Sequence, residues 1–247
     1  MQGTYIWNKL RIQRPKVACL IMAIMVSVGC FGQSQGKKWV RKNNPNYDER
    51  KFSYGFLIGL HSSMPQIEYS NQFVTPAFDT LYAVHPDWSA GFSLGFIVNY
   101  RAAEFLDLRL TPKVGFYEHK FRYVFTNAPA VEQLAETTMV EIPVLAKYKS
   151  VRRGNLRMYM IGGVTPSIEA SGKKDLESST EAIELERFNL SLEAGFGFDL
   201  YYPLFKFSPE IRYARGVLDM LGNRTNQFGQ PLQRVTVNTV TLYLLFQ

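Results

Sequence analysis

Apolar and polar positions alternate along most of the chain after residue 51. In the segment 88–100, WSAGFSLGFIVNY, the even-numbered positions are apolar, and the odd-numbered ones, except Ile97, are small or polar. An alternation with a period of two is typical of a β-strand with one apolar face.

The same alternation recurs in seven further segments of the chain. With 88–100, the segments that it predicts as strands are 52–61, 106–116, 140–148, 157–169, 190–202, 205–213 and about 234–246. The last of them is apolar on both faces toward its end, which leaves its register ambiguous. The sequence therefore predicts an all-β protein of eight strands.

The predicted connections between these strands alternate in length. Short links lie at 101–105, 151–155 and 203–204, whereas the links at 62–87, 118–138, 170–188 and 217–233 are long and polar. Short turns at one end and long loops at the other are typical of bacterial outer-membrane barrels. Strands of about ten to fourteen residues are long enough for a tilted crossing. We therefore expect an eight-stranded antiparallel transmembrane β-barrel over residues 52–247.

A soluble sandwich or lipocalin-like barrel would show the same period, with its apolar face turned inward. The large aromatic residues on one face, and the glycine and serine on the other, favour the membrane barrel. Four prolines fall within the predicted strands: Pro112, Pro143, Pro166 and Pro209. Because proline lacks the ladder donor, each is expected at a bulge, a strand end or a rim.

The start of the chain has the layout of a secretory signal peptide. Four basic residues precede an uncharged run at 17–32, and Cys30 lies close to the expected cleavage site before Gln33. A lipoprotein site at Cys30 is the alternative, although Ser27 fits that motif poorly. The expected organisation is a signal peptide at 1–32, a basic periplasmic segment at 33–51 and the barrel at 52–247.

Cleavage would change the charge and the thiol content. The chain has a net charge of +7, and loss of four from its 28 basic residues leaves 24 against 21 acidic ones. Both cysteines, Cys19 and Cys30, would be removed as well. The small remaining excess argues against nucleic acid as a partner. With no thiol in the mature chain, disulfides and thiolate metal sites are excluded.

Charged residues on the polar faces of the predicted strands would point into the barrel. We call eight of them the lumen network: Arg109, Lys113, Glu141, Lys147, Glu193, Asp199, Glu210 and Arg212. Since the interior of an eight-stranded barrel is narrow, these charges are expected to pair and to plug it. A proton or ion path is the alternative interpretation.

Motifs for catalysis are weak in this sequence. Residues 91–95 match the G-x-S-x-G pattern of hydrolases, but strand rather than helix follows Ser93, so small residues that make room for larger neighbours explain the match better. His61 and Ser63 share a face near a strand end and could act as base and nucleophile of a lipid-modifying barrel enzyme. The three histidines have no metal-ligand spacing, and we expect neither metal nor cofactor.

Three segments resemble the PorT family of outer-membrane proteins. They are KKWVRKNNPNYDERKFSYGFLIGL (37–60), EIPVLAKY (141–148) and SPEIRYARG (208–216). The resemblance implies a barrel of the type IX secretion system, which is found in Bacteroidota and tied there to gliding motility. It implies no catalytic residues, and it implies other type IX components and outer-membrane lipid as partners. A structural or adhesive barrel whose outer loops bind a ligand is a further alternative.

Overall fold

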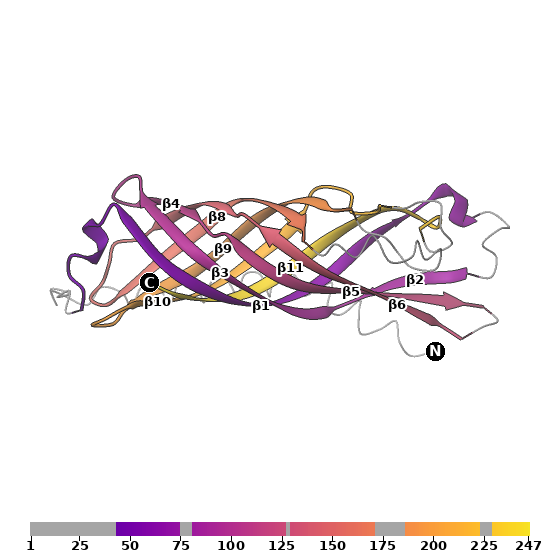
Figure 1. Cartoon of the computed structure of the whole chain (residues 1–247), viewed down its shortest axis with the longest axis horizontal. Coiled ribbons are helices and arrows are strands. Elements are labelled where there is room, and N and C mark those ends of the chain that lie inside the picture. The colour runs from indigo at the N-terminus through magenta and orange to yellow at the C-terminus, as the bar shows by residue number, and fades with distance from the viewer. Residues whose placement is uncertain (1–42, 75–80, 127–128, 171–185, 223–228) are drawn as a thin grey trace, which may run out of the picture. The chain divides into compact units, whose positions relative to one another are not determined.

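The computed structural model describes residues 43–74, 81–126, 129–170, 186–222 and 229–247, which form one antiparallel β-sheet closed into a barrel (Figure 1). Two short 3-10 helices, Tyr47–Glu49 (η1) and Asn71–Val74 (η2), flank the first strand. The strands are β1 (Phe52–Tyr69), β2 (Leu81–Asp87), β3 (Ser89–Arg101), β4 (Leu106–Leu110), β5 (Lys113–Phe125), β6 (Val131–Glu141), β7 (Val144–Lys149), β8 (Leu156–Glu169), β9 (Phe188–Tyr201), β10 (Lys206–Gly216) and β11 (Leu232–Phe246).

The predicted signal peptide at 1–32, and the part of the predicted basic segment at 33–42, lie outside the described residues. No helix among the residues that are described is both long and apolar enough to cross a membrane.

The strand pairings form a closed circuit. Going around the wall, β1 pairs with β3, then follow β4, β7, β8, β9, β10 and β11, and β11 pairs again with β1, all antiparallel. β5 continues the line of β4, β6 leads into β7, and β2 leads into β3. The eleven strands therefore occupy eight positions around the barrel, in agreement with the predicted eight-stranded fold.

Proline interrupts the wall at the predicted places on two strands. Pro112 lies between β4 and β5, and Pro143 lies between β6 and β7. The register of the pairing is unchanged across each gap, because each gap has the same number of residues, two, on both of the neighbouring strands. Backbone carbonyls still accept there, from Phe96 N–H to Pro112 and from Thr111 N–H to Pro143.

The expectation for the other two prolines was wrong, since neither marks a bulge or a strand end. Pro166 lies inside β8, where its carbonyl accepts from the Ile142 N–H, so its missing donor faces the gap at Pro143. Pro209 lies inside β10, at a position where the pairing with β9 is interrupted. A proline is tolerated within these strands because the ladder is already open beside it.

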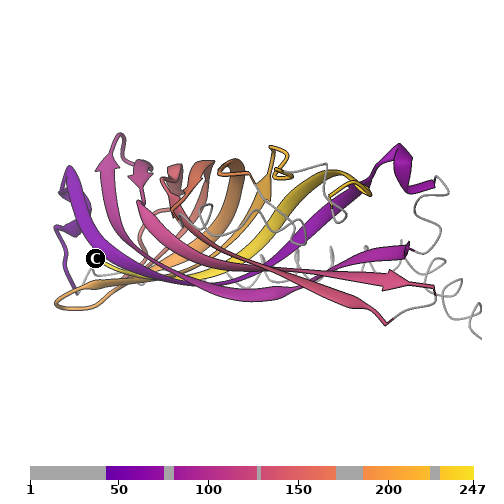
Figure 2. The ribbon, with the colours of Figure 1, turned by 45° about the vertical axis from the view of Figure 1, so that its right-hand side comes forward.

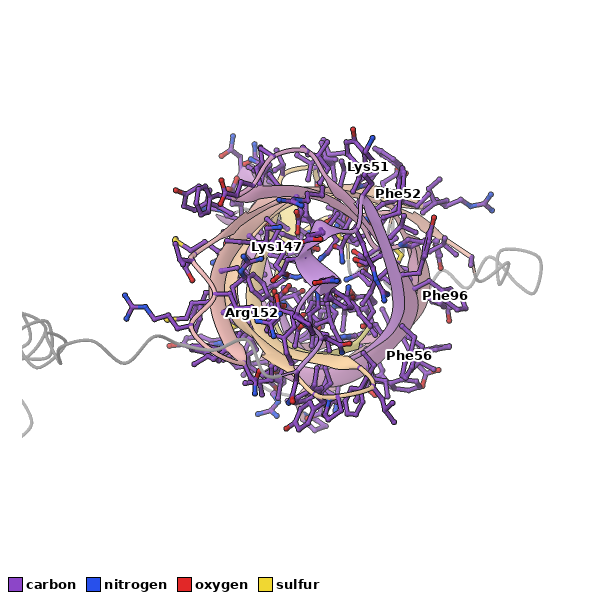
Figure 3. All side chains as sticks on the ribbon, turned by 90° about the vertical axis from the view of Figure 1, so that its left-hand side faces the viewer. Lys51, Phe52, Phe56, Phe96, Lys147 and Arg152 are labelled. Atoms are coloured by element: carbon purple, nitrogen blue, oxygen red, sulfur yellow. The ribbon has the colours of Figure 1, made fainter. Side chains whose placement is uncertain are left out.

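The apolar faces of the strands point outward. Phe56 on β1 and Phe96 on β3 are 51% and 70% exposed. Ser93, on the other face of β3, and Lys147, on the polar face of β7, are fully buried. Seen from one end, the labelled phenylalanines lie outside the wall and Lys147 lies inside it (Figure 3). A soluble barrel would bury its apolar face instead, so the arrangement fits a barrel surrounded by lipid. In β11 the odd-numbered residues from Val235 to Leu245 face inward, which resolves the ambiguous register.

The three short turns lie at one end of the barrel, as predicted, between β3 and β4, β7 and β8, and β9 and β10. At the other end, the prediction of long loops at 62–87 and 118–138 was wrong over most of their length. β1 continues to Tyr69, and β2, β5 and β6 form a three-stranded extension beyond the barrel wall (Figure 2). Charged residues on its outer face, such as Lys120 and Arg122, hid the alternation from the sequence pattern.

Candidate functional site in the barrel interior

The structure brings all eight residues of the lumen network into the interior. Each has 6% or less of its surface exposed, and four are basic and four acidic. Their strands run from β4 to β10, so the network links most of the barrel wall across the lumen. Balanced charge is what a narrow, solvent-poor space requires, because an unpaired buried charge is costly.

Within the lumen network, Lys147 and Asp199 form the pair nearest the end with short turns. The Lys147 ammonium donates to both carboxylate oxygens of Asp199, at 2.7 and 2.9 Å. The Ser208 hydroxyl donates to the same carboxylate at 2.7 Å, and Lys206 Nζ lies 3.9 Å away. Lys147 Nζ also lies 3.7 Å from the centre of the Tyr159 ring, a favourable cation–π contact.

Glu210 is the centre of the next cluster. Its carboxylate accepts from the Arg109 guanidinium at 2.7 Å, from the Tyr159 hydroxyl at 2.6 Å and from Arg212 Nε. Arg109 Nε donates in addition to Asn99 Oδ1 at 2.7 Å. Charge-assisted bonds of this kind hold both arginines in one orientation.

The third cluster lies further toward the long loops. Lys113 forms an ion pair with Glu141 at 2.6 Å and lies 4.0 Å from Glu193. Glu193 also accepts from Arg212 at 3.2 Å, which connects this cluster to the previous one. The hydroxyl of Tyr117 donates to Glu141, and the Lys113 ammonium donates to the hydroxyl of Tyr243.

Glycines on the inward faces leave the space that these large side chains occupy. A Cβ at Gly197 would lie 2.6 Å from the Tyr159 hydroxyl, and one at Gly59 would lie 2.6 Å from a Tyr243 ring carbon. Ser93, at the centre of the G-x-S-x-G match, is fully buried beside Gly59 within the wall. The match therefore has a packing role and forms no strand-to-helix turn.

The segment 43–51 lies across the barrel end with short turns, where η1 is seen within the ring of strands (Figure 3). The carboxylate of Asp48 accepts from Tyr201 at 2.6 Å, from Arg157 at 3.1 Å and from Arg152 at 3.4 Å. Arg152 also donates to the backbone carbonyls of Asn43 and Asn44. This part of the basic segment is thus bound to the barrel and closes its mouth.

At the opposite end the interior changes from polar to apolar. A cavity of about 40 Å³, lined by residues that include His119, Thr165 and Thr241, lies beyond Lys113 and is large enough for a few water molecules. Further toward the long loops, a hydrophobic cluster fills the space between β2, β5 and β11. It consists of Leu81, Val84, Phe121, Tyr123, Leu221, Leu232 and Val235. Three kinds of structure therefore obstruct the lumen along its length: the segment 43–51, the ion-paired clusters and the hydrophobic cluster.

His61 and Ser63, the candidate catalytic pair, also point into the lumen. They are 5% and 1% exposed. The His61 ring stacks on Tyr117 with 4.2 Å between ring centroids, and Ser63 Oγ lies 3.5 Å from Ser89 Oγ. Glu68, the nearest acidic residue in sequence, is exposed on the outer face of β1. The geometry brings His61 and Ser63 to one face, and no carboxylate among the described residues forms a hydrogen bond or ion pair with His61.

Sequence reasoning missed several residues that extend the lumen network. Asp107 and Lys149 form a buried pair at 2.5 Å; parity in the predicted strand 106–116 could have revealed Asp107, whereas Lys149 lies one residue beyond the predicted strand 140–148. Tyr159 and Tyr243 were missed because no inward face was assigned to the segment 157–169 and the register of the last strand was ambiguous. Within the described residues, no three His, Cys, Asp or Glu side chains are grouped as metal ligands.

A closed barrel with an apolar exterior and a polar, ion-paired interior defines the class of outer-membrane β-barrel proteins. Residues 31–222 match the family described as the outer membrane protein beta-barrel domain, and the chain belongs to this family. The protein is accordingly located in the outer membrane. A comparison with curated protein sequences gave no match.

Solved outer-membrane proteins resemble the chain in structure at low sequence identity. The crystal structure of OprG from Pseudomonas aeruginosa is 13% identical, with a TM-score of 0.45, and the match covers 78% of this chain and 93% of OprG. The solid-state NMR structure of AlkL in DMPC bilayers is 11% identical, with a TM-score of 0.43, and the match covers 87% and 94% of the two chains. Neisserial surface protein A is 14% identical, with a TM-score of 0.37, covering 79% and 98%.

Proposed function

We propose that this barrel serves type IX protein secretion without catalysing a reaction, by assembling, stabilising or regulating a larger translocon. The resemblance to the PorT family carries the assignment to type IX secretion. Two of the resembling segments, 141–148 and 208–216, supply five inward-facing residues to the lumen clusters: Glu141, Lys147, Ser208, Glu210 and Arg212. The resemblance therefore includes residues that build the interior.

The obstructed lumen supports an indirect role. Cargo cannot pass through this lumen. The ion pairs of Lys147, Arg109 and Lys113 cross it, and the segment 43–51, held by Asp48, lies across one end. Other type IX components in the outer membrane or the periplasm would instead contact the outer surface or the end at which the segment 43–51 lies. A link to gliding motility is part of the same proposal.

The test compares the proteomes of culture medium and periplasm in cells with and without this protein. Cargo that carries a C-terminal sorting domain is expected to accumulate in the periplasm of deficient cells, while other outer-membrane proteins remain at normal levels. Normal export of this cargo would refute the role in secretion.

The alternatives are separated by complementing the deficient cells with variants. The Ser63→Ala variant is expected to restore secretion, whereas a lipid-modifying enzyme that uses His61 and Ser63 would lose its activity and leave the lipids unmodified. Deletion of 171–187 tests the adhesive alternative, which predicts loss of surface binding with secretion intact.

A further inference from the structure

On the outer surface of β10 and β11, arginines follow exposed apolar residues toward the end with long loops. Tyr213 on β10 and Val240 on β11 are exposed apolar residues. Closer to the long loops, the same face of β10 carries Arg215, and the same face of β11 carries Arg234 near the start of the strand. Because long loops are extracellular in outer-membrane barrels, this boundary lies at the outer leaflet.

A groove of about 720 Å³ lies on this boundary. The strands β1, β9, β10 and β11 contribute Met64, Leu192, Arg215, Arg234 and Thr236 to its lining. Val217, which follows β10, lines it as well. Apolar side chains and two guanidinium groups thus share one hollow surface, which suits a ligand with a charged head and an apolar tail.

The two arginines lie near the same short stretch of chain. Arg215 is in register with Asn238, and Arg234 lies four residues further along β11, about 13 Å at the usual rise per residue. However, Arg234 Nη2 donates to the backbone carbonyl of Val217 at 2.7 Å, which directs its guanidinium toward the end of β10. Val217 is two residues from Arg215, and Arg215, Val217 and Arg234 all line the groove.

Neither arginine has a carboxylate partner among the described residues. The contrast with the outer face of the β2–β5–β6 extension is clear. There, Lys120 pairs with Glu118 at 2.6 Å, and Arg122 pairs with Asp87 at 3.0 Å and Glu132 at 3.2 Å. Among the described residues, no ion pair neutralises the charge of Arg215 or Arg234, although Glu68 faces Arg234 across the ladder.

We propose that this groove binds the phosphate-bearing head group of a glycolipid in the outer leaflet. The planar guanidinium forms two parallel hydrogen bonds to a phosphate, and its charge strengthens them. Acyl chains of the same lipid would lie along exposed Leu192, Tyr213 and Val240 below the arginines. Glu68, opposite Arg234 in register, also lines the groove and can accept hydrogen bonds from sugar hydroxyls.

This proposal rests on the outer-membrane location and is independent of a role in secretion. Its first test uses the unaltered full chain, purified in detergent and mixed with lipid A that carries phosphate or with the same lipid after enzymatic dephosphorylation. Native mass spectrometry then measures the bound fraction. Phosphorylated lipid A is expected to bind at least about tenfold more tightly. Equal binding of the two lipids would overturn the proposal.

The second test locates the site. The double variant R215Q/R234Q is expected to lose at least about tenfold in affinity for phosphorylated lipid A. The matched variant K120Q/R122Q removes two charges from the same extracellular zone and is expected to bind as the unaltered chain does. A heat-dependent gel shift checks that both variants fold. Undiminished binding by folded R215Q/R234Q would refute the site, and so would an equal loss in K120Q/R122Q.

A third measurement separates the lipid from free phosphate. Inorganic phosphate at millimolar concentration is expected not to displace the bound lipid A, because it lacks the acyl chains that contact Leu192 and Tyr213. Full displacement by inorganic phosphate would show a simple anion site and contradict the lipid assignment.

Discussion

The Tyr201 hydroxyl, at the end of β9, donates a hydrogen bond of 2.6 Å to the carboxylate of Asp48, which precedes the first strand by four residues. Two buried arginines, Arg152 and Arg157, converge on the same carboxylate. One acidic side chain therefore fixes the segment 43–51 across the barrel mouth.

Substitution of Asp48 by alanine is expected to release this segment. Arg152 and Arg157 lose their shared carboxylate, and each charge-assisted hydrogen bond contributes about 1.5–3 kcal/mol. We expect trypsin to cleave after Arg50 or Lys51 at least about tenfold faster, because cleavage follows the population of the open form. Limited proteolysis of the folded barrel in detergent measures this rate.

The control for this prediction is Glu49→Gln. Glu49 is adjacent and exposed, and it has no ion pair among the described residues. Its substitution is expected to leave the cleavage rate unchanged. Equal rates for Asp48→Ala and the unaltered chain would mean that Asp48 does not hold the segment.

The pair Lys147–Asp199 is expected to stabilise the barrel only as a pair. Lys147→Met leaves a buried carboxylate whose remaining cation, Lys206, is 3.9 Å away, and the free energy of unfolding should fall by about 3–5 kcal/mol. The double variant Lys147→Met/Asp199→Leu removes both charges and should recover most of this loss. Urea titration, followed by the heat-dependent gel shift, provides the measurement.

An exposed ion pair provides the comparison for this cycle. Arg122→Met breaks contacts with Asp87 and Glu132 on the outer face of the extension, and we expect a change below about 1 kcal/mol. The prediction for the buried pair is contradicted if Lys147→Met/Asp199→Leu is no more stable than Lys147→Met. The loss in Lys147→Met would then not come from leaving Asp199 unpaired.

The alternation in the sequence was sufficient to predict the barrel and the inward position of Glu210 or Lys147, because parity alone decides which face of a strand a residue occupies. It failed where the outer face becomes hydrophilic. In β5, Phe121 and Tyr123 continue the inward series, but Lys120 and Arg122 on the other face resemble a polar loop.

Partners within the lumen could not be predicted, since they depend on the stagger between strands. Arg109 and Glu210 are 101 residues apart and meet because the closed wall places β4 and β10 on opposite sides of one narrow lumen. The contact of Asp48 with Tyr201 was also outside the reach of periodicity, because the segment 43–51 has no regular alternation. A short polar segment before a strand gives no signal that it folds back.

The space at Gly197 is expected to be essential for the Glu210 cluster. A Cβ there would lie 2.6 Å from the Tyr159 hydroxyl, so Gly197→Ala should displace the ring and lower the free energy of unfolding by about 1–3 kcal/mol. Gly162→Ala is the matched control, because the nearest atom to its Cβ is 3.5 Å away. The same urea titration compares them, and equal stability of the two variants would contradict the packing argument.

The barrel is expected to be electrically silent. The interior of an eight-stranded barrel is just filled by side chains, and here ion pairs, the segment 43–51 and the cluster around Phe121 and Tyr123 obstruct it in series. Purified full-length protein inserted into planar bilayers should show no stable single-channel current. A current that scales with salt concentration would favour the ion path over the plugged lumen.

Removal of one obstruction should not open the barrel. Asp48→Ala releases the segment 43–51 but leaves the pairs of Lys147, Arg109 and Lys113 and the apolar cluster in place. We expect this variant to remain silent in the same bilayers although trypsin cleaves it faster. Conductance that appears with Asp48→Ala alone would mean that the segment is the only effective barrier, and it would make the periplasmic end a gate.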